Sequence, residues 1–275
     1  MTELQVIAIY CFCDDFLRAK GYQDWPNVKM SLSEIMLVYI VATRFFYGNI
    51  ERAYRMIKDQ RYINKGLSKG RLNTRLHAIH PQIWHDLMRF VYEQRQLLGL
   101  SKEFVVDNFP ISVCRNIRIS RCRIYEGEEF RGYNKSKREY FYGLKVNMIA
   151  TTDGQPFEVM LCPGKYHDSE PFKLIHLNLP EGSSLYGDSA YTDYEKEDEL
   201  TKRGIRVVIE SKANSCRPLF YEDWQDLKRF RRRIETAFSQ ISGFLPKKIH
   251  AITDAGFELK VMGFILALAI NFIIN

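Results

Sequence analysis

The hydrophobic pattern of this chain changes type near Gly99, and that change restricts the folds open to it. Before Gly99, apolar residues recur at helical spacing, as at Ile7 and Cys11. After Gly99, the segment 142–148 alternates apolar and polar side chains, which is the pattern of a strand with one buried face. We therefore expect a helical domain over residues 1–99 and a sheet-containing domain over residues 100–275.

Helix-start signals support the first of these domains. Ser31 followed by Glu34 is a capping-box pattern that opens an apolar run. Ser68 is a suitable N-cap for a helix reaching Ile79, and a turn containing Gly66 precedes it.

The second domain contains five predicted strands. A strand at 104–107 precedes a β-hairpin over 142–161 that turns at Asp153-Gly154. Strands at 184–188 and 205–210 follow, separated by a helix over 191–203. This order predicts an α/β domain with a mixed five-stranded sheet, in which strands 104–107 and 184–188 are neighbours.

Three carboxylates occupy positions where they can converge. Asp107 and Asp188 each end a short apolar strand, and Glu235 lies in a later helix whose apolar stripe predicts a face on the sheet. That stripe consists of Phe230, Ile234, Phe238 and Ile241. The alternatives are ordinary: Asp is common where a strand turns, and Glu235 is spaced for an ion pair with Arg231.

The charge distribution favours a polyanionic partner. The formal net charge is +7, and basic residues form two groups rather than an even spread. The first group runs from Arg115 to Arg138, and the second, from Lys228 to Arg233, immediately precedes Glu235. Basic runs are often only solvated faces, but these two flank candidate catalytic acids, which favours nucleic acid.

At these positions the chain resembles the DDE transposases of bacterial insertion sequences, whose catalytic domain has the ribonuclease H-like fold. The matching segments are Val106-Asp107-Asn108-Phe109-Pro110, Tyr186-Gly187-Asp188-Ser189-Ala190-Tyr191 and Arg232-Arg233-Ile234-Glu235-Thr236-Ala237-Phe238. The resemblance implies that Asp107, Asp188 and Glu235 bind two Mg²⁺ or Mn²⁺ ions. It also implies an enzyme that cuts and joins DNA strands.

The resemblance is incomplete around the glutamate. Related transposases often carry a tyrosine, an arginine and a lysine at set spacings there. Arg231 fits the arginine position, but Lys228 and Ser242 occupy the other two. The DNA-contact roles of the family tyrosine and lysine are therefore not transferred to this chain.

The expected partner is double-stranded DNA, both the terminal inverted repeats of an element and its target. Segments Glu51–Lys58 and Ser68–Ile79 have helix-turn-helix proportions, with an ordinary helical pair as the alternative. The candidate DNA-binding residues are Lys69, Arg71, Arg75, Arg231 and Arg232. Joining two ends suggests at least a dimer. The competing functions are a ribonuclease H-like nuclease without strand transfer and a relative that only binds DNA.

Other features argue against competing classes. The six cysteines lack the paired spacing of a zinc site, which together with the absence of a signal peptide predicts reduced thiols in the cytoplasm, near a bacterial nucleoid. The apolar stretch from Val261 to Ile274 is shorter than the roughly 20 residues a bilayer requires, so we expect a buried helix. His167, in the segment Lys165-Tyr166-His167-Asp168-Ser169, is left open between a DNA contact and a local hydrogen bond, whereas Asp168 or Ser169 is expected to cap the next helix.

Overall fold

A computed structural model describes residues 1–97, 99, 102–134, 137–175, 177–211, 215 and 217–274, excluding the side chains of residues 231–234 and 237. Its internal contacts divide the chain into two units, one of residues 1–95 and 244–275 and the other of residues 96–243. The sequence-based division near residue 99 lies close to the first boundary. The C-terminal segment 244–275, however, belongs to the helical unit and not to the sheet unit.

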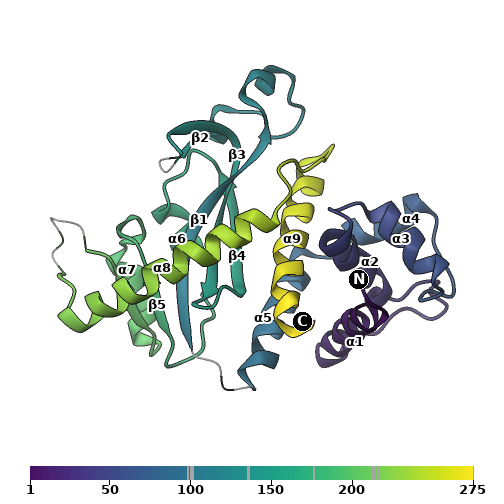
Figure 1. The fold of residues 1–275 in the computed structure, drawn as a ribbon, viewed down its shortest axis with the longest axis horizontal. Helices are drawn as coiled ribbons and strands as arrows, with labels where there is room; N and C mark the ends of the chain where they lie inside the picture. Colours follow the sequence, from purple (N-terminus) through teal and green to yellow (C-terminus); the bar gives the residue numbers. More distant parts are fainter. Residues whose placement is uncertain are drawn as a thin grey trace. The chain divides into compact units, whose positions relative to one another are not determined.

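The helical unit is built around two strongly apolar helices, α2 (Leu32–Phe45) and α9 (Asp254–Ile274) (Figure 1). The Tyr39 hydroxyl of α2 donates a hydrogen bond to the Leu259 carbonyl oxygen of α9. A Cβ at Gly263 would collide with the Tyr39 ring, so glycine permits this close approach. The remaining helices are α1 (Glu3–Ala19), α3 (Ile50–Asp59), α4 (Lys69–His77) and α5 (Pro81–Gln96).

Among the described residues, α9 is the one helix long and apolar enough to cross a membrane by length and composition. The core helix of a soluble protein passes the same test. Phe257, Val261, Leu266 and Ile270 are each at most 1 % exposed within the helical unit. Their burial gives α9 its apolar surroundings without a bilayer.

The predicted capping box at α2 is confirmed. The Ser31 hydroxyl accepts a hydrogen bond from the Glu34 backbone N–H at 3.1 Å, and Glu34 Oε2 accepts one from the Ser31 N–H at 2.7 Å. Ser68 caps α4 through a single bond, in which its hydroxyl accepts from the Arg71 N–H at 3.4 Å.

We expect Ser31→Ala to lower the free energy of unfolding by about 1 kcal/mol, because the first turn of α2 loses its side-chain acceptor. Chemical denaturation measures the change. Ser120→Ala, at an exposed position that caps no α-helix, is the control and should change stability by less than about 0.5 kcal/mol. Equal effects of the two substitutions would contradict the capping argument.

The sheet unit contains a six-stranded mixed sheet with flanking helices, so the predicted α/β class is confirmed. The strands are β1 (Glu103–Cys114), β2 (Arg131–Asn134), β3 (Glu139–Thr151), β4 (Pro156–Pro163), β5 (Ser184–Gly187) and β6 (Arg206–Ile209). The main path runs β2-β3-β1-β5-β6, and β4 also pairs with β3. All five predicted strands are present, but the predicted number was too low because the short strand β2 was missed.

The directions of the strands determine where the candidate carboxylates lie. β3 pairs antiparallel with β1, whereas β1, β5 and β6 are parallel to one another. The connections include α6 (Ser169–Leu174), α7 (Tyr194–Lys202) and the short 3-10 helices η1 (Asn116–Arg121), η2 (Glu128–Phe130) and η3 (Ser189–Tyr191). The long helix α8 (Tyr221–Phe244) crosses the sheet (Figure 1).

Candidate active site

Asp107 and Asp188 are brought together by the register of two parallel strands. Val106 of β1 is paired with Gly187 of β5, so the two aspartates are the residues that follow a matched pair. Asp188 directly follows the carboxyl end of β5, whereas Asp107 lies within β1, which continues to Cys114, so the prediction that Asp107 ends its strand is wrong. Both aspartates lie where the parallel pairing stops, at the edge of the sheet where ligands bind in open α/β folds. The predicted adjacency of strands 104–107 and 184–188 is therefore confirmed.

Asp107 carries the most perturbed carboxyl group of this edge. Its pKa is raised from 3.8 to about 7, chiefly by burial and then by the nearby carboxylates of Asp188, Asp168 and Glu235. The Asn108 backbone N–H, which donates to Asp107 Oδ1 at 2.7 Å, acts in the opposite direction on this pKa. The cause of the raised pKa is therefore both desolvation and repulsion among acids.

Asp188 has a defined local role as well. It is the N-cap of η3, and its Oδ1 accepts a hydrogen bond from the Ala190 N–H at 2.9 Å. This bond fixes the orientation of an exposed carboxylate beside Asp107. The alternative interpretation of Asp188 as a turn residue is therefore correct for its local contacts. It is compatible with metal binding as well, because the carboxylate has further lone pairs that can bind an ion.

Glu235 is positioned by two aromatic contacts of α8. Phe230 packs on Tyr186 of β5, with ring centroids 4.7 Å apart, and Phe238 packs on Phe109 of β1, with centroids 6.4 Å apart. Phe109 lies two residues beyond Asp107, so both side chains point to the same face of the sheet, the one that α8 covers. Glu235 lies between Phe230 and Phe238 on this helix, and its side chain is exposed. Its carboxylate contributes to the raised pKa of Asp107.

The apolar stripe predicted for this helix is confirmed where it is described. Phe230, Phe238 and Ile241 are 2 %, 5 % and 1 % exposed. The side chain of Ile234, the fourth predicted member, lies outside the described residues, and so does that of Arg231, the alternative ion-pair partner of Glu235.

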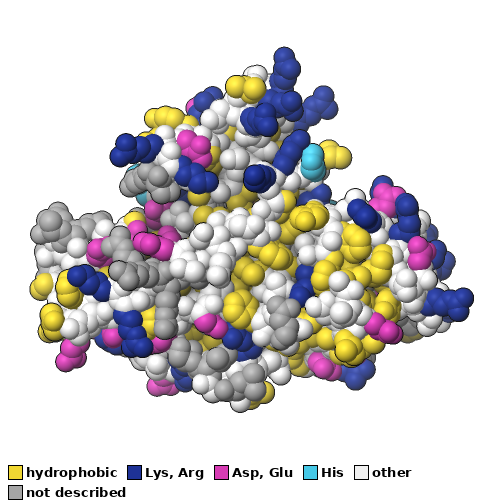
Figure 2. All heavy atoms as spheres, viewed as in Figure 1, with side chains coloured by type: hydrophobic (Ala, Val, Ile, Leu, Met, Phe, Trp, Pro, Cys, Tyr) yellow, Lys and Arg dark blue, Asp and Glu magenta, His cyan; other side chains and the backbone are white. Residues whose placement is uncertain are grey.

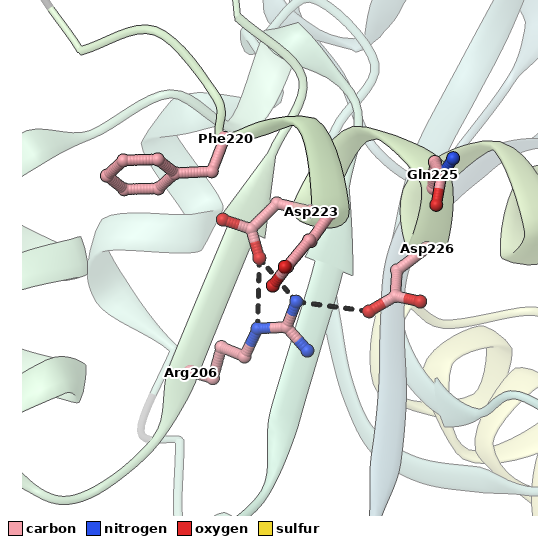
Figure 3. A pocket seen from close by; sticks show the side chains of 6 residues that line it. Arg206, Phe220, Asp223, Gln225 and Asp226 are labelled. Atoms are coloured by element: carbon pink, nitrogen blue, oxygen red, sulfur yellow. Dashed lines mark hydrogen bonds and ion pairs between the residues drawn. The ribbon is translucent and has the colours of Figure 1, made fainter.

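Ion pairs of Arg206 with Asp223 and Asp226 hold the start of α8 against the sheet (Figure 3). Arg206 of β6 donates through Nε to Asp223 Oδ1 at 3.0 Å and through a terminal nitrogen to Asp226 Oδ2 at 3.0 Å. Both aspartates belong to the first turns of α8. These ion pairs thus complement the aromatic contacts in setting the position of Glu235.

The structure adds residues that the sequence interpretation did not assign to the site. Asp168 occupies the N-cap position of α6 without a side-chain capping bond and instead pairs with Lys145 Nζ at 2.9 Å. The expected capping role is therefore not performed by this carboxylate. Asn108 donates to the Tyr191 hydroxyl at 3.0 Å, and the pKa of buried Tyr191 is raised, chiefly by desolvation and then by Asp107. Both Asn108 and Tyr191 were present in the matching segments, but their contact depends on the fold.

The carboxylate oxygens of Asp107, Asp188 and Glu235 are suitable ligands for a hard divalent cation, although they are too far apart here to bind one together. Across the described part of the chain, no three His, Cys, Asp or Glu side chains are close enough to hold an ion as they stand. The three carboxylates, which the sequence placed where they can converge, are therefore not at ion-binding spacing in the described structure. Oxygen donors that repel one another and raise the pKa of Asp107 are nevertheless the groups that Mg²⁺ or Mn²⁺ would stabilise.

The candidate DNA-binding residues of the helical unit differ in their contacts. Arg75 donates to the Met30 carbonyl oxygen at 2.5 Å and lies 3.8 Å from Asp24, so it is engaged within the unit. Lys69 is exposed and pairs with Glu51 of α3 at 2.5 Å. Arg71 is exposed on α4. Of the three, Arg71 therefore has the side chain most available to a ligand.

The basic residues before Glu235 are described only in part. The side chains of Arg231 and Arg232, both candidate DNA-binding residues, lie outside the described residues. Lys228 Nζ lies 3.7 Å from the centre of the Trp224 ring, and Ser242 donates to the Ser239 carbonyl oxygen at 3.0 Å. These contacts are local to α8.

A second basic surface covers the outer part of the sheet unit. Figure 2 shows Lys and Arg side chains gathered over β2 and the adjoining end of β3. The exposed residues of this surface are Arg115, Arg118, Arg121, Arg123, Arg131, Lys137 and Arg138. His167 is exposed in the segment after β4, in the same unit. The surface is suited to a phosphate backbone, which requires positive charge but no fixed sequence.

Comparison with known proteins identifies the family of the sheet unit. A family model described as "Transposase DDE domain" matches residues 99–252. A search of curated proteins found no match. Among solved structures, the chain is similar to a piggyBac transposase in a synaptic complex with hairpin DNA, with 8 % identity and a TM-score of 0.43. That similarity covers 98 % of this chain and 71 % of the other chain.

A mixed sheet that brings Asp107 and Asp188 together where its parallel pairing ends is the arrangement expected of a DDE enzyme, a class that generally uses divalent metal ions. The matched segment spans more than half of the sequence and includes Asp107, Asp188 and Glu235. The chain belongs to the transposase DDE domain family.

Proposed function

We propose that this transposase binds the terminal inverted repeats of its element and carries out metal-dependent DNA cleavage and strand transfer. The observation that carries the proposal is the raised pKa of Asp107, because it reports a buried carboxylate crowded by Asp188, Asp168 and Glu235. Such crowding is unfavourable in the free protein and is relieved when divalent cations bind.

Asp107, Asp188 and Glu235 are the residues proposed to hold two Mg²⁺ or Mn²⁺ ions. Ions held there would supply a nucleophile from water or a DNA 3′-hydroxyl and would stabilise the departing 3′-oxygen. Asp107 supplies the rigid part of the site, since β1 and the Asn108 N–H fix its carboxylate. Glu235 is the exposed member, and α8 sets its position through Phe230 and Phe238.

A ribonuclease H-like nuclease that cleaves without joining is the second candidate. The two functions separate in a strand-transfer assay with a pre-cut donor end and Mg²⁺. Joined products support a transposase, whereas cleavage of uncut donor with no joining supports the nuclease. A protein that only binds DNA is disfavoured, because binding has no use for the acidic group around Asp107.

The helical unit is proposed to read the terminal repeat through α4. In the full-length chain, we expect Arg71→Ala to weaken binding to the element's own ends by about 1–3 kcal/mol if Arg71 contacts a base. If it contacts only phosphate, binding to all duplexes weakens alike and the salt slope falls by about 1. Titrations at several stated salt concentrations distinguish the two cases.

Arg61→Ala is a control for this measurement, since Arg61 is exposed in the same unit but outside α4. Arg75→Ala is a poor probe, because the Arg75 guanidinium donates a hydrogen bond to the Met30 carbonyl oxygen and the loss of that bond would disturb folding. Unchanged affinity of the Arg71 variant for terminal and random DNA would remove Arg71 from the interface.

The assembly and location follow from the same proposal. Two ends must be held for strand transfer, so the active form is expected to be at least a dimer. Light scattering with and without end DNA measures this. The place of action is proposed to be the bacterial cytoplasm, at the nucleoid.

A further inference from the structure

The outer end of the sheet unit contains a cavity of about 640 Å³ that the metal-binding residues do not line. It lies between the paired strands β2 and β3 and the segment 164–168, which follows β4. Its walls include Tyr133, Tyr140, Arg131, Lys165 and the Lys145–Asp168 pair. The volume is within the roughly 300–1,000 Å³ typical of small-ligand sites.

The cavity is built by close packing and hydrogen bonds. A Cβ at Gly132 would collide with the Phe141 ring and would lie 2.5 Å from the Gly164 carbonyl oxygen, so β2 approaches this segment only because residue 132 is glycine. Lys165 donates its backbone N–H to the Glu129 carbonyl oxygen at 2.9 Å. Lys145 Nζ donates to the Tyr166 carbonyl oxygen at 2.8 Å. The walls are thus held in place before any ligand binds.

Two tyrosines supply an aromatic surface on the cavity wall. Tyr133 and Tyr140 are directly opposite each other across β2 and β3, with ring centroids 4.9 Å apart. They remain 45 % and 71 % exposed, although tyrosine rings usually bury much of their area. Exposed aromatic rings are the groups on which unpaired bases stack, whatever the base sequence.

Positive charge lines the same cavity. Lys165 is exposed and has no ion-pair partner within the described ranges of the chain. Arg131 pairs with Glu128 through Nε at 2.8 Å and remains half-exposed. A cavity that combines tyrosine rings with Lys and Arg is complementary to a base joined to a phosphate. The basic surface from Arg115 to Arg138 continues outward from it.

The cavity also borders the candidate active site. Lys145, which lines it and pairs with Asp168, is opposite Pro110 of β1, three residues beyond Asp107. A strand whose phosphodiester lies at Asp107 can therefore have a neighbouring nucleotide within reach of the cavity.

We propose that this cavity holds an unpaired nucleotide of the DNA strand being processed, with its base against Tyr133 and Tyr140 and its phosphate beside Lys165. The proposal rests on the DNA-cleaving function proposed above. It adds a position where the enzyme favours an unpaired strand end over a continuous duplex.

The test uses the full chain with Ca²⁺ in place of Mg²⁺ and two probes. One is a blunt duplex, and the other is the same duplex with a short single-stranded overhang containing 2-aminopurine. We expect the overhang probe to bind about tenfold more tightly, because stacking of one base on an aromatic side chain has about that effect. We also expect its fluorescence to be quenched on binding.

The double substitution Tyr133→Leu/Tyr140→Leu should remove both the preference and the quenching. Tyr133→Phe/Tyr140→Phe should retain both, because the rings remain. Tyr221→Leu is the matched control, since Tyr221 is also exposed in the sheet unit but lies outside the cavity. Thermal melting of each variant establishes that the fold is intact.

Two results would overturn this inference while leaving the proposed function in place. One is Mg²⁺-dependent cleavage by the wild type with equal affinity for the two probes. The other is a change of oligomeric state in the Leu variant with the overhang preference unchanged, which would identify the tyrosines as a contact between copies. Failure of the wild type to bind or cleave any DNA would instead count against the proposed function itself.

Discussion

Asp107→Asn, Asp188→Asn and Glu235→Gln are each expected to reduce DNA cleavage by at least about a thousandfold, which corresponds to roughly 4 kcal/mol of lost transition-state stabilisation. The substitutions nearly preserve shape but remove an anionic oxygen that the metal ions require. Cleavage of labelled end DNA in Mg²⁺ measures the loss.

DNA binding should be largely retained by these variants, because the basic surfaces are untouched. Glu195→Gln is the matched control: Glu195 is an exposed carboxylate on α7, and its loss should leave cleavage unchanged. Substantial Mg²⁺-dependent cleavage by any one of the three variants would remove that residue from the site. If cleavage and binding were lost together, with a lower melting temperature, the effect would be structural.

The second large effect concerns stability and pH. Because the pKa of Asp107 is raised from 3.8 to about 7 in the folded chain, the protonated form stabilises the fold. That contribution is fully present below about pH 4 and is lost as the pH rises through about 7. Asp107→Asn removes the titration. The variant should therefore be more stable than the wild type at pH 8 by at most about 4 kcal/mol, and nearly equal to it at pH 4.

Partial solvent exposure of Asp107 makes the difference smaller than this upper bound. Denaturation in EDTA across the pH range measures both. Added Mg²⁺ should then stabilise the wild type at pH 8, by about 2.7 kcal/mol at a hundred times its dissociation constant, and should do little for Asp107→Asn. A variant less stable than the wild type at pH 8, together with no effect of Mg²⁺ on either protein, would contradict the crowded-carboxylate interpretation.

Local features of the fold could be predicted because their causes are local. Ser31 and Glu34 close a capping box with each other, and strand alternation follows from which face of the chain is buried. The short strand β2 escaped prediction since its four residues include Gly132, which contributes no side chain to a pattern. Its strand conformation comes from pairing with β3.

The candidate site, too, was predicted in part from the sequence and in part depends on the tertiary structure. The sequence placed Asp188 at a strand end and Glu235 beside an apolar stripe, and it marked the chain as a DDE transposase. Its placement of Asp107 at a strand end was wrong, because β1 continues to Cys114 through pairing with β3. The mutual effects of these acids depend on strand register and on the contacts of Phe230 and Phe238, which join residues far apart in the chain. The role of Asp168 could be recognised only in the folded chain: the sequence named Asp168 or Ser169 as the helix cap, and Asp168 occupies the N-cap position while its carboxylate pairs with Lys145.

The sequence by itself determined the order of the helices and of five strands, the caps of α2 and α4 and the choice of three candidate acids, because short-range periodicity and local chemistry encode them. The tertiary structure alone decided that α9 packs in the helical unit, where Gly263 admits the Tyr39 ring. It also decided that Asp107 lies among like charges and that Tyr133 and Tyr140 border a basic cavity. Burial and electrostatic repulsion depend on distances in space, and those distances exist only once the chain has packed.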